Sequence, residues 1–125
     1  MKQFIILTSI CFFSLASYAG TVDTVNIYSN SMHRNIKCVV IKPDNYKNKT
    51  TRFPVVFLLH GYSGNYANCI TRVPQLKEHV DTYQVIIVCP DGGYSSWYFD
   101  SAVDSSYRFE THVVVEVVNY VDKNY

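Results

Sequence analysis

Two apolar runs, each followed by a loop that contains glycine, constrain the fold of this chain more than any other feature. Val55–Leu59 consists of five apolar residues without interruption and leads into His60–Gly64. Gln84–Cys89 contains the second apolar run, and Pro90–Gly93 follows it. Continuous apolar runs of this length are typical of strands covered on both faces, as in a sheet between layers of helices. We therefore expect two buried strands with glycine loops at their carboxyl ends.

The residues before these runs predict two more strands. In Thr24–Tyr28, Val25 and Ile27 alternate with polar neighbours, which indicates a strand with one buried face. Ile36–Lys42 is rich in β-branched residues and is closed by Pro43, which begins a turn signal. Together the two segments predict an antiparallel pair that precedes the rest of the sheet.

The remaining periodic segments predict helices. Tyr66–Val80 has a roughly helical pattern that Pro74 should interrupt, leaving a main helix at Gln75–Val80. A second helix is expected over about Phe109–Lys123, where apolar residues at spacings of three and four should share one face: Val113, Val114, Val117, Val118 and Val121. Strands and helices in this order predict an α/β fold, with a mostly parallel sheet and helices on both of its faces.

The first 19 residues have the features of a signal peptide. Lys2 provides a short basic start, Phe4–Ala16 is apolar, and Ser17–Ala19 is a small-x-small cleavage signal. The apolar stretch is shorter than the about 20 residues that a transmembrane helix needs. We expect cleavage after Ala19, a secreted or periplasmic protein without a stable membrane anchor, and a single domain over residues 20–125. A buried first helix is the alternative, because the apolar stretch is also of helix-core length.

The charge balance and the cysteines exclude some classes of function. The chain has 11 Lys and Arg and 10 Asp and Glu, so removal of Lys2 with the leader leaves ten of each and a net charge of zero. This balance implies neither nucleic acid nor an anionic membrane surface as a partner. Cys38, Cys69 and Cys89 remain after the leader is removed, and their spacings match no metal-ligand pair such as C-x-x-C. We expect structural thiols, although an exported chain can form one disulfide.

The two glycine loops are the candidate site. In α/β sheets of this kind, ligands bind beyond the carboxyl ends of the strands, where both loops are expected. Glycine lets backbone N–H groups come close to a ligand, a geometry that suits an oxyanion. The long loop Gly92–Tyr107 follows, and loops of that length in a compact domain are usually functional or mobile. Its aromatic residues, Trp97 and Tyr98 among them, could line a substrate pocket or fill the core.

Four segments in a fixed order resemble an esterase family of the α/β-hydrolases that includes esterase D, S-formylglutathione hydrolase, feruloyl esterases and mycolyl transferases. The segments are Phe53–Gly64, Val88–Gly93, Ser96–Tyr98 and Tyr107–Thr111, and the resemblance runs from about Ile36 to Tyr125. It implies a carboxylic ester hydrolase in which a serine attacks the ester carbonyl, a histidine moves the proton and backbone amides hold the oxyanion. The substrate would be a small-molecule ester or an ester linked to a polysaccharide.

The resemblance also implies roles for individual residues. The backbone N–H of Tyr62 would be one donor of the oxyanion hole, and the other would come from the residue after the nucleophile. Substrate contacts are expected at Gly61, Trp97 and Tyr98, and loop-ordering roles at His60, Asp91 and Glu110. We expect no cofactor and no metal, because His112 with Glu116 lacks a third ligand and the acidic residues of the long loop lack the spacing of an EF-hand.

The nucleophile motif itself does not occur in these residues. None of the serines after the first glycine loop has glycines two residues to either side, as G-x-S-x-G requires. We therefore expect the chain to stop before its catalytic serine, acid and histidine, and to be inactive alone. The alternative is a non-catalytic or degenerate secreted α/β module, such as a carbohydrate-binding one. A nucleotide-binding Rossmann domain is disfavoured, because His60–Asn65 does not supply G-x-G-x-x-G.

Overall fold

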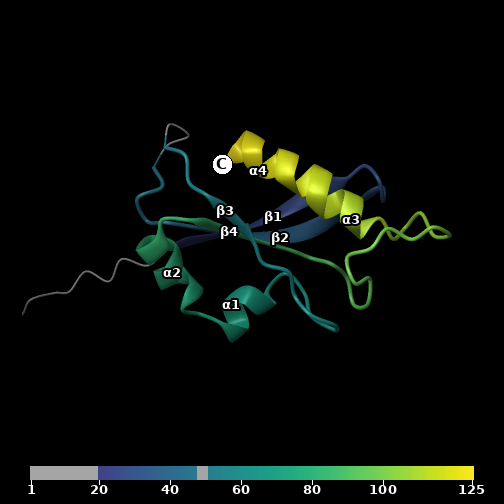
Figure 1. The fold of residues 1–125 in the computed structure, drawn as a ribbon, viewed down its shortest axis with the longest axis horizontal. Helices are drawn as coiled ribbons and strands as arrows, with labels where there is room; N and C mark the ends of the chain where they lie inside the picture. Colours follow the sequence, from purple (N-terminus) through teal and green to yellow (C-terminus); the bar gives the residue numbers. More distant parts are fainter. Residues whose placement is uncertain (1–19, 48–50) are drawn as a thin grey trace, which may run out of the picture.

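The computed structural model describes residues 20–47 and 51–125, so the signal peptide expected over residues 1–19 lies outside the described part of the chain. Four strands form one sheet in the order β1-β2-β4-β3 (Figure 1). The strands are β1 (Thr21–Ser29), β2 (Arg34–Lys42), β3 (Val55–Phe57) and β4 (Ile86–Pro90). β1 pairs with β2 and β2 with β4 in antiparallel fashion, whereas β3 and β4 are parallel. The expected antiparallel first pair is confirmed, and the sheet is mixed over the described strands.

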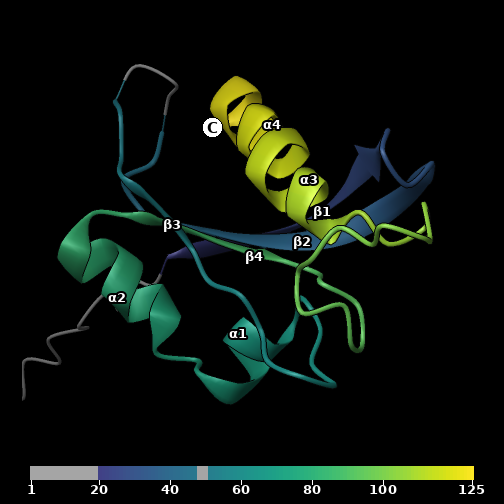
Figure 2. The ribbon, with the colours of Figure 1, turned by 45° about the vertical axis from the view of Figure 1, so that its right-hand side comes forward.

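Helices cover both faces of this sheet, as predicted. The helices α1 (Asn68–Arg72) and α2 (Leu76–Tyr83) lie on one face, and a continuous helix made of α3 (Phe109–Thr111), η1 (His112–Val117) and α4 (Val118–Asn124) lies on the other (Figures 1 and 2). Pro74 separates α1 from α2, as expected from its missing N–H. None of the helices in residues 20–47 and 51–125 is long and apolar enough to cross a membrane.

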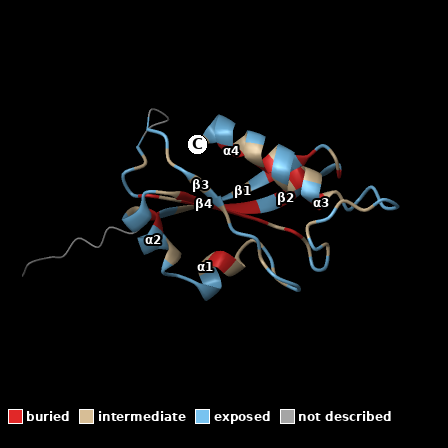
Figure 3. Cartoon of the chain, viewed as in Figure 1, coloured by how far each residue is buried: buried red, intermediate tan, exposed pale blue. Residues whose placement is uncertain are grey.

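Two apolar clusters hold these layers together (Figure 3). Under the C-terminal helix, the buried residues are Ile27, Cys38, Val40, Ile86, Val88, Val117 and Val121. Under α1 and α2, they are Val39, Ile41, Cys69, Val80, Ile87 and Cys89. Alternate residues of β2 and β4 enter opposite clusters, because successive side chains of a strand point to opposite faces. The two central strands therefore form the buried middle of the molecule.

The strand β3 differs from its prediction. The apolar run Val55–Leu59 was expected to be covered on both faces, but Val56 is 46% exposed and Leu59 45% exposed. The reason is position: β3 is the last strand in the sheet order, so it has only β4 as a neighbour in the described residues. In β4, by contrast, every residue is buried. The apolar run predicts that a strand forms here, but the position of that strand in the sheet determines how much of it is buried.

The C-terminal helix contains a π-helical turn that shifts its buried face. Six residues, His112–Val117, adopt this wider turn, and the buried positions run Phe109, His112, Val117 and Val121. A π-helix places residues five apart on one face, so the step from His112 to Val117 is longer than an α-helix allows. As a result, Val114 is 60% exposed instead of lying on the buried face as predicted.

A buried polar contact fills the π-helical turn. His112 is fully buried, and its Nδ1 lies 2.7 Å from Glu116 Oε2. The other carboxylate oxygen of Glu116 accepts the Ser31 N–H at 2.9 Å, which joins the helix to the β1–β2 turn. Burial opposes ionisation of Glu116, but hydrogen bonds from Ser29, His112 and the Ser31 N–H outweigh it and lower the pKa of this carboxyl.

Candidate active site

Two loops meet at the carboxyl ends of the parallel strands β3 and β4. The N–H of Leu58 donates to Val88 O at 2.8 Å, which continues the pairing one residue beyond β3 and keeps the loops together. Both loops and part of the long loop line a pocket of about 200 Å³, which we call the rim pocket. Its lining residues are His60, Gly61, Tyr62, Gly92, Gly93, Tyr94, Ser95, Ser96, Trp97 and Tyr98. The predicted site residues Gly61, Tyr62, Trp97 and Tyr98 are therefore brought together.

His60 links the two glycine loops. Its Nε2 accepts the backbone N–H of Gly92 at 2.9 Å, so the proton of the neutral ring is on Nδ1, which donates to Gly61 O at 2.9 Å. The Asp91 carboxylate lies 3.8 Å from the same Nε2, but this nitrogen acts as an acceptor, so the two groups do not form an ion pair. Both ring nitrogens of His60 are engaged within the loops, which suits an ordering role better than that of a general base.

Asp91 connects the second loop to the segment that precedes α1. One carboxylate oxygen accepts the N–H of Gly93 at 2.7 Å, and the other accepts the N–H of Tyr66 at 3.4 Å. The Asp91 N–H donates to Lys37 O at 3.0 Å, so the residue is also held to β2. These contacts are of the kind expected for an ordering residue, and that role remains a prediction.

Tyr98 is packed between the loops. Its hydroxyl accepts the N–H of His60 at 3.1 Å and donates to Pro90 O at 3.3 Å. Its ring covers Gly92 so closely that a Cβ at that position would lie 2.4 Å from the ring carbon Cζ. Burial, with a further contribution from the nearby Asp91 charge, raises the pKa of Tyr98 to about 12. No motif predicts this packing, because Tyr98 and His60 are 38 residues apart.

The backbone around Tyr62 forms a tight turn at the mouth of the rim pocket. The N–H of Gly64 donates to Gly61 O at 3.0 Å, and the N–H of Ser63 donates to Tyr94 O at 2.9 Å. Ser63 has a φ of 58°, in the left-handed region. The Tyr62 N–H finds no acceptor among residues 20–47 and 51–125, and the residue is 60% exposed. The turn therefore leaves one backbone donor free at the carboxyl rim of the sheet, in a residue that lines the pocket.

Aromatic side chains form the outer wall of the rim pocket. The Tyr62 ring stacks on Trp97 with centroids 6.1 Å apart and planes inclined by 27°, and it meets Tyr94 edge-on at 5.1 Å. Trp97 is 69% exposed. Trp97 and Tyr98 have φ values of 54° and 58°, which are rare for residues with side chains and tend to occur at functional sites. Trp97 is therefore available for ligand contact, whereas Tyr98 is held in the loop structure.

Gly61 leaves open space in the rim pocket. A Cβ at Gly61 would meet no atom within 4 Å. The predicted contact of this residue with substrate thus has room, and it remains a prediction.

Asp100 holds the start of α3, next to Glu110, for which a loop-ordering role was predicted. Asp100 accepts the N–H of Thr111 at 3.0 Å and also its hydroxyl, which caps the start of α3, and Arg108 lies 3.9 Å away. Burial opposes ionisation, but the hydrogen bonds from Thr111, the Arg108 charge and the Glu110 N–H together lower the pKa of Asp100. The Glu110 side chain is exposed and forms no hydrogen bond or ion pair within the described ranges. Only the N–H of Glu110 takes part in this arrangement, and the loop-ordering role of this residue remains a prediction.

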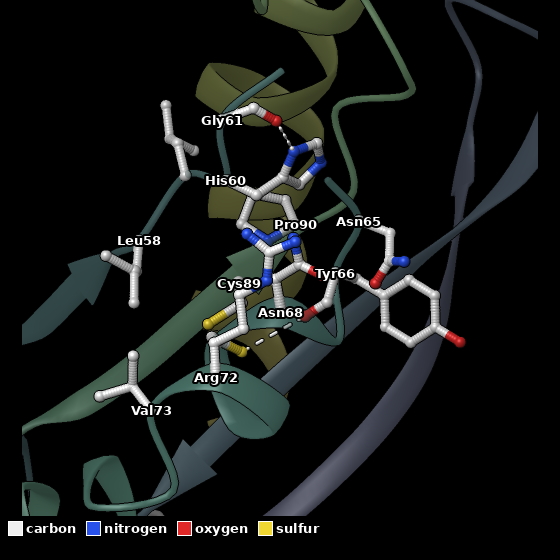
Figure 4. Close-up of a pocket in the computed structure, with 12 residues that line it drawn as sticks. Leu58, His60, Gly61, Asn65, Tyr66, Asn68, Arg72, Val73, Cys89 and Pro90 are labelled. Atoms are coloured by element: carbon white, nitrogen blue, oxygen red, sulfur yellow. Dashed lines mark hydrogen bonds between the residues drawn. The ribbon is translucent and has the colours of Figure 1, made fainter. Parts of the chain in front are cut away.

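A second pocket of about 200 Å³ lies between α1 and the segment after β3, and we call it the α1 pocket (Figure 4). Leu58, Val73 and Pro90 supply part of its apolar lining, together with the thiols Cys69 and Cys89. His60 and Gly61 border this pocket as well as the rim pocket. Within residues 20–47 and 51–125, no group of three or more His, Cys, Asp and Glu side chains could hold a metal ion.

The fold and the two glycine loops define the class of protein: these residues form a sheet and helices of the α/β-hydrolase type. Residues 29–125 match the sequence profile described as "Putative esterase". The match covers most of the chain, so the chain belongs to that esterase family. The expected family and fold are thereby confirmed.

Known proteins of the same kind are similar to this chain over part of their length. Esterase Rv1288 of Mycobacterium tuberculosis is 25% identical over 88 residues, which are 69% of this chain and 19% of that protein. A ferulic acid esterase structure has a TM-score of 0.72 at 24% identity, covering 86% of this chain and 45% of its own. An S-formylglutathione hydrolase from Agrobacterium tumefaciens has a TM-score of 0.72 at 18% identity, covering 87% and 46%. At these identities the two structures show a shared fold.

Proposed function

We propose that this chain supplies the amide half of a serine carboxylesterase site. Membership of the esterase family supports an esterase-type function. The observation that carries the finer proposal is the free N–H of Tyr62, in a residue that lines the rim pocket at the carboxyl ends of β3 and β4. A donor fixed before the reaction is what an oxyanion hole requires, because it stabilises developing charge without reorganisation.

In the proposed reaction, each rim residue acts through its position. The Tyr62 N–H donates to the oxygen of the attacked carbonyl as that oxygen gains negative charge. His60 holds the Tyr62 loop against the Gly92 loop, and the stacked rings of Tyr62 and Trp97 provide an apolar surface for the acyl group. The attacking serine, with its histidine and acid, is supplied by residues that this sequence does not include. The 125 residues alone should therefore not turn over esters.

The substrate is proposed to be an ester with an aromatic or other flat acyl group, either small or attached to a polysaccharide. Exposed stacked rings favour a flat ligand, because aromatic pairs prefer offset stacking. The similar structure named ferulic acid esterase is in keeping with this choice. Export through the signal peptide, with cleavage after Ala19, would bring the protein to extracellular esters.

A binding experiment tests the amide half without requiring turnover. We would titrate the ¹⁵N-labelled chain with phenylphosphonate, an aromatic anion that mimics the charge of the tetrahedral intermediate, and follow amide shifts. The amide of Tyr62 and the indole N–H of Trp97, the only tryptophan, should shift together and saturate. Shifts confined to other parts of the chain, or none at millimolar ligand, would contradict the proposal.

Two variants separate the amide from the phenol of Tyr62. Tyr62→Pro removes the N–H, and Tyr62→Phe keeps it, so only the first should abolish phosphonate binding. In a form of the protein that also carries the nucleophile, Tyr62→Pro should lower kcat by about 100- to 1000-fold, the usual loss for one oxyanion donor. Equal effects of the two variants would show that the side chain, rather than the amide, matters.

The non-catalytic alternative rests on the absence of G-x-S-x-G from these residues and on the exposed Trp97. A carbohydrate-binding module would bind a neutral oligosaccharide through Trp97 and would bind it equally well with Tyr62→Pro. Saturable binding of xylohexaose without binding of phenylphosphonate would favour this alternative.

A further inference from the structure

The three cysteines of the described chain lie on two sides of the sheet. Cys38 is in the cluster beneath the C-terminal helix, whereas Cys69 and Cys89 are in the cluster beneath α1 and α2. Cys89 faces its partner Val39 across the β2–β4 ladder, and Val39 is on the α1 side. Because adjacent residues of β2 point to opposite faces, the sheet itself separates Cys38 from the other two thiols.

Cys69 and Cys89 are neighbours although 20 residues separate them. Both side chains belong to the buried cluster under α1 and α2 and line the same pocket, and the Cys69 thiol donates to Tyr66 O at 3.3 Å. Two thiols that share one buried cluster and one pocket are candidates for a disulfide, because disulfide formation depends on a close approach of the two residues. The pair connects α1 to the end of β4.

Both thiols are buried but line the α1 pocket, where Figure 4 shows Cys89 beside Pro90 and near Arg72. A small reagent can therefore reach the pair from solvent. On the other side of the sheet, Cys38 borders none of the pockets described above.

We propose that Cys69 and Cys89 form a disulfide when the protein meets a small-molecule disulfide as oxidant, and that Cys38 remains a thiol. The thiolate of Cys69 attacks one sulfur of the oxidant, whose S–S bond breaks and releases one thiolate, which takes a proton. Cys89 then loses its proton and attacks the Cys69 sulfur, releasing the second half of the oxidant as a thiol. Two protein thiols are oxidised by two electrons, and one disulfide is reduced to two thiols.

The acidities of the thiols agree with this order. The neighbouring Cys89 thiol lowers the pKa of Cys69, and the Cys69 thiol, together with burial, raises the pKa of Cys89. Cys69 is thus the first nucleophile, since the thiolate is the reactive form. Burial raises the pKa of Cys38 to about 12, which keeps this third thiol protonated.

The bond would secure the framework of the rim pocket. Cys89 immediately precedes Pro90 and Asp91, and Cys69 lies in the helix that follows the Tyr62 turn. Joining the two residues therefore ties both glycine loops to one covalent ring that spans residues 69–89. This inference concerns the thiols and stands whether or not the proposed esterase function is correct.

Peptide mapping tests the proposal on the whole chain. The protein is incubated with excess oxidised glutathione, blocked with iodoacetamide, digested with trypsin without reduction and analysed by mass spectrometry. The four cysteines fall on separate tryptic peptides: Cys11 on 3–34, Cys38 on 38–47, Cys69 on 53–72 and Cys89 on 78–108. The expected product is a linked pair of peptides 53–72 and 78–108, lost on reduction, with Cys38 carbamidomethylated. A dominant link from Cys38 to either thiol, or full alkylation of Cys69 and Cys89, would overturn the proposal.

Single serine variants provide the matched control. Cys38→Ser should leave the linked pair unchanged, because Cys38 is across the sheet. Cys89→Ser should stop the reaction at a glutathione adduct on Cys69, whereas Cys69→Ser should leave Cys89 unmodified. An adduct that forms at least as fast on Cys89 in Cys69→Ser as on Cys69 in Cys89→Ser would refute the proposed order of attack.

Discussion

Gly92 and Gly61 line the same rim pocket, but alanine should have very different effects at the two positions. Neither glycine has a positive φ, so the backbone accepts alanine at both and only the added methyl group decides the outcome. At Gly92 this methyl would lie 2.4 Å from the Tyr98 ring, whereas at Gly61 it would meet nothing within 4 Å. The pair therefore isolates the packing of Tyr98 against the second glycine loop.

The expected destabilisation by Gly92→Ala follows from the contacts that the Tyr98 ring loses when the new methyl group displaces it. Its hydroxyl bonds to the His60 N–H and to Pro90 O would be lost or strained, at about 1 kcal/mol each. Overpacking adds about 1 to 3 kcal/mol. We expect Gly92→Ala to lower the free energy of unfolding by about 3 kcal/mol. Gly61→Ala should change it by less than about 0.5 kcal/mol, or raise it slightly through the lower entropy of the unfolded chain.

Urea unfolding followed by far-ultraviolet circular dichroism measures both variants. The same measurement in a Tyr98→Ala background provides the decisive comparison, because removal of the ring should remove most of the cost of Gly92→Ala. If Gly92→Ala costs no more than Gly61→Ala, or if its cost is the same without the Tyr98 ring, the proposed packing of the two loops is wrong.

Three further predictions concern the sheet edge, the π-helical turn and the helix cap. Val56→Lys should reduce concentration-dependent association in sedimentation velocity, because a charge protects an open strand edge, whereas Val103→Lys in an exposed loop should not. The pKa of Glu116 in the folded protein lies below 4.5, so ionised Glu116 stabilises the fold above pH 4.5, and this stabilisation is lost as the pH falls through the folded-state pKa. Glu116→Gln should therefore flatten the decline of the urea midpoint over that pH range. Asp100→Ala should cost about 1 kcal/mol as the loss of a cap, measured by urea unfolding, against little change for the exposed Asp104→Ala.

The features that the sequence predicted are those that depend on neighbouring residues. The glycine loops after two apolar runs, the first antiparallel pair and the break at Pro74 are all local patterns, and the structure confirms each of them. His60 was expected to act within its loop, and the structure shows which atoms it contacts. Its partner Gly92 lies 32 residues away, and a single sequence carries no mark of that pairing.

The features that the sequence did not predict depend on long-range geometry. Asp100 caps a helix that begins nine residues later in the chain, after a loop whose path no motif describes. The exposure of Val56 follows from the position of β3 in the sheet order, which the apolar composition of the strand does not determine. The placement of Cys69 and Cys89 in one cluster likewise depends on which face of the sheet each side chain covers. The spacing of the three cysteines along the chain does not indicate which two lie in the same cluster.

The π-helical turn carries one residue more than an α-helix needs to cover the same length. From Phe109 to Val121 the buried positions are spaced by three, five and four residues. Deleting Val115, which is 51% exposed, would shorten the spacing between the buried His112 and Val117 from five residues to four. The buried residues would then follow the spacing of a regular α-helix. The helix should therefore tolerate the loss of a whole residue here, at the cost of rebuilding the His112–Glu116 contact, whereas a deletion within α4 would turn Val121 away from the sheet.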